Sequence, residues 1–189
     1  EMCIRDRFRF DLKNPNLPNN DRFILSKGHA SPLFFSLYTV AGAITEKELL
    51  TFRKKGSRIE GHPTVDFPYT EVPTGSLGQG LSAGVGMAIN AKHLDKLPYQ
   101  TYVLLGDGEM AEGSNYEALA IAAHYKLDNL VAIVDVNRLG QSDPTMPGHK
   151  VDVYADRAKS FGWKAIVIDG HDLKQIEKDF KKADKVKFK

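Results

Sequence analysis

Two polar residues, Asp107 and Asn137, follow short apolar runs that stop at turn signals. Residues 102–105 run into Gly106-Asp107-Gly108, and residues 130–135 run into Asn137. Apolar runs of this length are typical of buried strands, and glycine-rich tripeptides end such strands in tight turns. A carboxylate and a carboxamide are hard oxygen ligands, so this pair could take part in binding a divalent cation.

One carboxylate and one amide carry too little charge to hold such an ion alone. Mg²⁺ prefers octahedral oxygen geometry and is commonly held by one or two protein groups together with phosphate oxygens and water. A phosphate-bearing cofactor would therefore complete the site. The alternative is that Gly106-Asp107-Gly108 is ordinary turn chemistry with no ligand.

The chain between the two residues has a pattern that would bring them together. Residues 113–125 are rich in Ala and Glu, with Leu119, Ala122 and Ala123 at helical spacing. A strand, a crossover helix and a second parallel strand form a right-handed unit in which both strands end at one edge of the sheet. We therefore expect an α/β fold with a doubly wound, mostly parallel sheet flanked by helices.

Further elements are expected on both sides of this unit. We predict strands at residues 22–25 and 163–169, and helices at about residues 32–41, 45–53, 80–92, 151–161 and 173–182. The helix at residues 32–41 is apolar nearly all round, so we expect it to be buried. Residues 54–73 are polar and punctuated by Gly and Pro, and loops of that length in compact domains are usually functional or disordered.

Two histidines are candidates for proton transfer. His29 precedes the helix at residues 32–41, where a neutral imidazole could face a ligand, and His62 lies in the long loop within Gly61-His62-Pro63. Each has a plainer interpretation, as a residue that satisfies backbone groups or as a surface-loop histidine. The Gly-rich segment 74–80 likewise either offers helix N–H groups to an anion or serves close packing only.

Composition limits the class of protein. A chain of 189 residues that is 42% hydrophobic suits one globular domain. The net charge of +2 argues against a nucleic-acid or membrane partner, and no apolar run approaches the roughly 18 residues that span a bilayer. The single Cys3 permits no intrachain disulfide, which agrees with a reducing compartment. We therefore expect a cytoplasmic protein.

Residues 1–7, EMCIRDR, carry neither an apolar period nor a start signal for an element. They resemble a translated sequencing-adapter scar, so we treat them as a non-native leader and exclude them from fold reasoning. We assign residues 8–189 to a single domain that is truncated at both ends.

Several motifs occur together in an order that resembles one family. They are LSKGHA, EGHP, TGSLGQG, GDGE with EG just after, YKLDNLVAIVDVNRLGQSDP, and FGW followed by DGH. In these motifs, from about residue 21 to residue 179, the chain resembles the N-terminal, diphosphate-binding domain of transketolases, especially the animal branch. The resemblance implies the thiamine-diphosphate-binding fold, with thiamine diphosphate and Mg²⁺ or Ca²⁺ as cofactors.

The resemblance also implies a role for each matching residue. The metal ligands would be the side chains of Asp107 and Asn137 and the backbone carbonyl of Leu139. The cofactor-binding residues would be His29, Gly75, Ser76, Leu77, Gly108 and Gln141. The catalytic residues would be His29, His62 and Glu112, with Glu112 contributing to a carboxylate link between the active sites of a dimer.

The implied reaction is transfer of a two-carbon ketol unit from a ketose phosphate to an aldose phosphate, in the pentose phosphate pathway. The sequence contains no pyrimidine-binding domain, which in the family supplies an activating glutamate, so we expect this polypeptide to be inactive alone. The pyrimidine-binding and C-terminal domains would come from the same or another chain, and the full enzyme would be a homodimer. The alternatives are a non-catalytic thiamine-diphosphate-fold binding module and a related enzyme such as deoxyxylulose-phosphate synthase.

Overall fold

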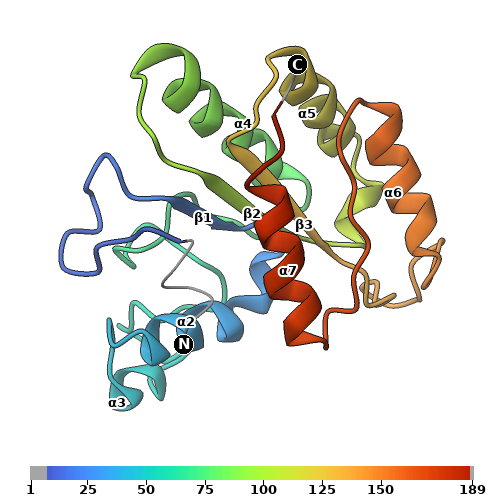
Figure 1. Ribbon diagram of the computed structural model, residues 1–189. Helices are drawn as coiled ribbons and strands as arrows, with labels where there is room; N and C mark the ends of the chain where they lie inside the picture. The colour runs from blue at the N-terminus through green and yellow to red at the C-terminus, as the bar shows by residue number, and fades with distance from the viewer. Residues whose placement is uncertain (1–7, 188–189) are drawn as a thin grey trace.

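A parallel sheet of three strands forms the centre of the computed structural model, which describes residues 8–187 (Figure 1). The strands are β1 (Arg22–Leu25), β2 (Thr101–Gly106) and β3 (Leu130–Asp135), in that spatial order. Arg22 pairs with Thr101, and Thr101 pairs with Leu130, so all three strands start level and point the same way. Their carboxyl ends therefore meet at one edge, as predicted. The leader predicted for residues 1–7 lies outside the described residues.

Helices cover both faces of this sheet. They are α2 (Ser31–Val40), α3 (Glu46–Leu49), α4 (Gln79–Ile89), α5 (Gly113–His124), α6 (Val151–Ser160) and α7 (Leu173–Ala183), and α4 continues into a π-helical turn, Asn90–Leu94. A Cβ added at Gly84 of α4 would lie 2.5 Å from Val103 Cγ2, so α4 packs closely on β2. The ring of Phe180 in α7 contacts Tyr102, which points to the opposite face from Val103. The α/β architecture with helices on both faces is confirmed (Figure 1).

The interior divides into two cores. The aliphatic core lies between the sheet and α4, α5 and α6; its buried members are Ile24, Leu81, Val85, Ala88, Val103, Leu105, Met110, Ala118, Leu119, Ala122, Leu127, Leu130 and Tyr154. The aromatic core lies around α2 and the loop that follows α3; its buried members are Leu25, Phe34, Phe35, Tyr38, Ile44, Ile59 and Phe67. Each half of the carboxyl edge therefore has a different support beneath it.

Two predictions about local structure are wrong. Residues 163–169 form no strand: Ile166 and Val167 are exposed, and the ordered contact of the segment is the Trp163 indole N–H donating to the Leu119 carbonyl at 2.9 Å. A β-prone run becomes a strand only when a neighbouring strand satisfies its backbone. The helix α2 is buried on one face only, because Leu33 is 47% and Val40 77% exposed.

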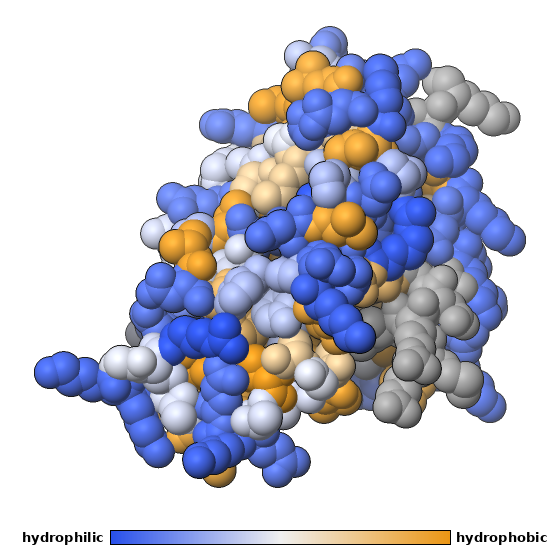
Figure 2. Space-filling model, turned by 90° about the vertical axis from the view of Figure 1, so that its left-hand side faces the viewer, coloured by the Kyte–Doolittle hydropathy of each residue, from blue (hydrophilic) through white to orange (hydrophobic). Residues whose placement is uncertain are grey.

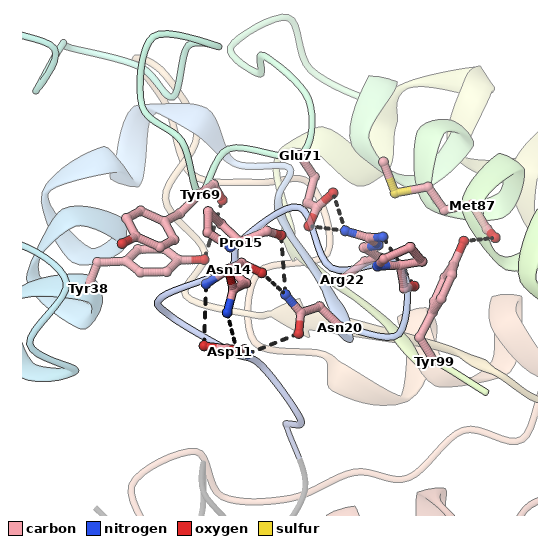
Figure 3. A network of polar contacts seen from close by, with 11 residues as sticks. Asp11, Asn14, Pro15, Asn20, Arg22, Tyr38, Tyr69, Glu71, Met87 and Tyr99 are labelled. Carbon is pink, nitrogen blue, oxygen red and sulfur yellow. Dashed lines mark hydrogen bonds and ion pairs between the residues drawn. The ribbon is translucent and has the colours of Figure 1, made fainter. Parts of the chain in front are cut away.

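The segment before β1 is held by a network of polar contacts, shown in Figure 3. The Asn20 side chain accepts from the Asp11 backbone N–H at 2.9 Å and donates to the Asn14 carbonyl at 2.9 Å. In β1, the Arg22 guanidinium pairs with Glu71 at 3.3 Å. Burial raises the pKa of Glu71, and the Arg22 charge opposes that rise. This ion pair ties the sheet to the long loop on the aromatic side.

The surface carries hydrophobic residues without forming one continuous apolar face. On the side shown in Figure 2, they appear as separate patches among hydrophilic residues. Exposed examples elsewhere in the described chain are Met146 at 91% and Leu173 at 76%. No helix among residues 8–187 combines the length and the apolar character needed to cross a bilayer.

Candidate functional site

The ends of all three strands are joined to one another at the carboxyl edge. The Asp107 backbone N–H donates to the Asp135 carbonyl at 3.1 Å, which continues the β2–β3 ladder past the last strand residue. The Lys27 ammonium, just beyond β1, pairs with the Asp135 carboxylate at 2.7 Å, and the Lys27 side chain is only 8% exposed. The edge therefore brings a buried cation and two carboxylates close together.

Asp107 is buried, with 3% of its surface exposed. One carboxylate oxygen, Oδ2, accepts from the Arg138 backbone N–H at 2.9 Å and from the Thr145 hydroxyl at 2.8 Å. The donors that the described residues give to this carboxylate all fall on Oδ2, and neither is a charged group. Since a buried carboxylate is costly without a compensating charge, the remaining oxygen suits a cation.

The other predicted metal ligands lie in the segment after β3. The Asn137 side-chain oxygen accepts from the Leu139 backbone N–H at 2.9 Å, and its amide donates to Asp135 at 3.1 Å. A Cβ built on Gly108 would lie 3.6 Å from the Leu139 carbonyl oxygen, so that carbonyl lies beside the turn that carries Asp107. Within residues 8–187 no group of three His, Cys, Asp or Glu side chains is arranged to hold a metal. The available donors are hard oxygens, which fit Mg²⁺ or Ca²⁺.

The two predicted histidines meet the Gly-rich segment. A Cβ on Gly75, whose φ is +150°, would lie 3.0 Å from His62 Cδ2, so the imidazole packs against that glycine. A Cβ on Gly28, next to His29, would lie 2.7 Å from the Gly75 nitrogen. The structure therefore brings the His29 turn, His62 and Gly75 together, and both imidazole side chains are exposed.

Backbone-directed hydrogen bonds hold this arrangement. The Thr74 hydroxyl donates to the Leu25 carbonyl at 2.7 Å, fixing the Gly-rich segment to the end of β1. The Ser31 hydroxyl, at the start of α2, donates to the Gly61 carbonyl at 2.7 Å, beside His62. The histidines are thus positioned through their neighbours, while their own side chains face outward.

The remaining predicted residues lie around the start of α4 and in the loop after β3. Ser76 is exposed and Leu77 is 40% exposed. Glu112 packs against Gly78: a Cβ on that glycine, whose φ is +83°, would lie 2.7 Å from Glu112 Cβ. Gln141 is exposed in the loop after β3. No described hydrogen bond joins its side chain to the other predicted site residues.

Glu109 is a site residue that the sequence reasoning missed. It is 2% exposed, and its carboxylate accepts from the Ser26 hydroxyl at 2.5 Å, the Gly78 N–H at 3.2 Å and the Gly106 N–H at 3.0 Å. Asn115 donates to the Glu109 carbonyl at 2.6 Å. One buried carboxylate therefore joins the end of β1, the Gly-rich segment and the Asp107 turn. The available signal was a carboxylate placed directly after a strand-ending Gly-Asp-Gly.

Comparisons with known proteins agree with this geometry. The family model "Transketolase, thiamine diphosphate binding domain" matches residues 2–189. The chain is 52% identical over 175 residues to a transketolase of Homo sapiens, covering 93% of this chain and 28% of that protein. It is 44% identical over 170 residues to one of the subunits of the apulose-4-phosphate transketolase of Phocaeicola vulgatus, covering 90% of this chain and 60% of that relative.

A solved structure gives the same result for the fold. The transketolase of Pichia stipitis in complex with sedoheptulose 7-phosphate superposes with a TM-score of 0.90 and 37% sequence identity, over 98% of this chain and 29% of that one. The chain thus spans less than a third of the length of these full transketolases.

Proposed function

The chain belongs to the family of transketolase thiamine-diphosphate-binding domains, and on that premise we propose that it is the diphosphate-binding part of a transketolase. The observation that supports this best is the buried Asp107 carboxylate at the carboxyl edge of the sheet. One of its oxygens is fixed by two neutral donors, and the Leu139 carbonyl lies beside the same turn. Open α/β sheets bind their ligands at this edge.

In the proposed function the polar end of the site holds the cofactor's diphosphate. Asp107, Asn137 and the Leu139 carbonyl would bind Mg²⁺ or Ca²⁺, with phosphate oxygens and water as further ligands. Gly108 would leave room for the diphosphate beside the metal. When bound, thiamine diphosphate supplies the carbanion chemistry that amino-acid side chains cannot. The cofactor-lining positions are Gly75, Ser76, Leu77 and Gln141.

The histidine end serves proton transfer and sugar binding. His29 and His62 present exposed imidazoles beside the Gly-rich segment. Imidazoles can both donate and accept protons near neutral pH. We assign to these two side chains hydrogen bonds to the oxygens of a donor sugar phosphate, and proton transfer at those oxygens.

The active enzyme would need more protein than this sequence contains. The Pichia stipitis relative binds a sugar phosphate as a protein of which this chain matches 29%, and the Phocaeicola vulgatus relative is named as one of several subunits. We propose that pyrimidine-binding and C-terminal domains, from the same or another chain, complete the site. The complete enzyme would be a homodimer, with Glu112 contributing to the carboxylate link between its active sites.

Coexpression with a polypeptide that carries the missing domains tests this function. The expected result is ketol transfer from sedoheptulose 7-phosphate to an aldose phosphate, dependent on both thiamine diphosphate and Mg²⁺. D107A should abolish the transfer, whereas D143A, an exposed aspartate in the loop after β3, should retain it. Cofactor binding without turnover would indicate a non-catalytic binding module. Metal-dependent cofactor binding that survives in D107A would overturn the proposed site.

A further inference from the structure

Thr145 lies between the predicted metal ligand and the turn that carries it. Its hydroxyl donates to Asp107 Oδ2 at 2.8 Å. Its methyl group lies on the other side, 3.7 Å from the position that a Cβ on Gly108 would take. Both branches of this side chain therefore contact the Asp107 turn, from a position 38 residues later in the chain.

The loop after β3 is folded so that it delivers this contact. The Thr145 backbone N–H donates to the Arg138 carbonyl at 2.9 Å, and Leu139 bridges to Pro144. Arg138 has a φ of +61°, a left-handed conformation that is uncommon for a residue with a side chain. In that conformation its N–H reaches Asp107 Oδ2 at 2.9 Å. The two ends of the loop thus close on the same carboxylate oxygen.

Two donors on one oxygen fix the orientation of the carboxylate. With Oδ2 held by the Arg138 N–H and the Thr145 hydroxyl, rotation of the Asp107 side chain would break both hydrogen bonds. Oδ1 is then left for the cation in a defined direction. Hydrogen bonds to the far side of a ligand commonly control metal affinity, and their loss typically costs about 10- to 100-fold.

We propose that Thr145 is a positioning residue for the metal, acting through its hydroxyl on Asp107. This inference rests on the proposed function, because it assumes that Asp107 is a metal ligand. The methyl group supports the turn at Gly108, and the hydroxyl sets the direction of the carboxylate. The two branches can be removed separately, since Val keeps the shape and loses the hydroxyl, whereas Ser keeps the hydroxyl and loses the methyl.

The test is calorimetric titration of the 189-residue chain with Mg²⁺, in the presence of saturating thiamine diphosphate. T145V is expected to weaken Mg²⁺ binding by about 10- to 100-fold. T145S should bind close to the wild-type level, and so should S142A, which removes an exposed hydroxyl from the same loop. Because Mg²⁺ demands stricter geometry than Ca²⁺, T145V should also lose more affinity for Mg²⁺ than for Ca²⁺.

Urea unfolding of the same variants separates positioning from general stability. A merely structural role would lower the stability of T145V and T145S together and would leave the Mg²⁺-to-Ca²⁺ preference unchanged. The inference is overturned if T145V binds Mg²⁺ like the wild type, or if T145S is weakened as much as T145V. If D107A abolishes binding while T145V does not, only this inference fails. Wild-type binding that is absent or insensitive to D107A would overturn the proposed function as well.

Discussion

The two halves of the candidate site are supported in opposite ways. At the anchoring half, Asp107 and Glu109 are buried side chains, and each receives hydrogen bonds from at least two donors. At the histidine half, His29 and His62 have exposed side chains, and the contacts that place them are made by neighbouring backbone. The first half is oriented by polar bonds to the functional groups themselves, and the second by the packing beneath them.

The aromatic core supplies that packing. Phe34 belongs to the helix that follows His29, and His62 lies between Ile59 and Phe67, which are both fully buried. A loop fixed at both sides of an exposed residue can hold that residue in place without burying it. The comparison predicts that core substitutions damage the histidine half most, and that polar substitutions damage the anchoring half most.

The largest expected effect on stability is that of F67A. The Phe67 ring lies 5.1 Å from the ring of Phe35 and 5.4 Å from that of Tyr38, with no exposed surface. Truncation leaves a cavity in the aromatic core and should lower the free energy of unfolding by about 3–5 kcal/mol. Urea unfolding at neutral pH measures this loss. V65A, an exposed position in the same loop, is the control and should stay within about 0.5 kcal/mol.

A second, smaller loss is expected for E109Q at the anchoring half. The carboxylate accepts from donors on both oxygens, so a carboxamide must turn its NH₂ group toward one of the backbone N–H donors, Gly78 or Gly106. An unsatisfied buried donor costs about 1–3 kcal/mol. Faster hydrogen exchange should appear at the Gly78 or Gly106 amide. The exposed Glu112 provides the control, E112Q; equal stability of E109Q and wild type would contradict the polar support of this half.

The βαβ unit could be predicted because its signals are local. The apolar runs, the helical spacing between them and the turn residues all lie within 102–139, and β2, α5 and β3 match them closely. The edge that carries Asp107 and Asn137 follows from the parallel direction of the strands alone. Placement of these two residues therefore needed no knowledge of distant contacts.

Other features depend on partners that are distant in sequence. The donors to Glu109 come from Ser26, Gly78 and Gly106, and no periodicity connects those positions. The contact of His62 with Gly75 crosses an irregular loop. Residues 163–169 have strand-forming side chains, but strand formation also needs a hydrogen-bonded neighbour, which sequence pattern cannot supply. Sequence thus predicted the ends of the strands better than the bonds made between them.

The buried ion pair of the aromatic half predicts a pH effect. Burial raises the pKa of Glu71, with Arg22 opposing, so the folded protein binds this proton more readily than the unfolded chain. Between the ordinary glutamate pKa of about 4.3 and the raised value, the contribution of Glu71 to the free energy of unfolding therefore falls as pH rises. E71Q removes that dependence, so its stability relative to wild type should improve between about pH 4 and pH 7. Urea unfolding at both pH values measures the change, and the exposed-site variant E60Q should show no such trend.

The smallest effect on stability is expected for H62A. Because the imidazole is exposed and its loop is held by Phe67 and the Ser31–Gly61 bond, the free energy of unfolding should change by no more than about 0.5 kcal/mol. In the coexpressed enzyme, by contrast, loss of a proton-transfer group should reduce ketol transfer by about 10²- to 10⁴-fold. Parallel urea unfolding and activity measurements would show both effects. A stability loss close to that of F67A would mean that the imidazole itself supports Gly75, and the two halves would then no longer differ in how they are held.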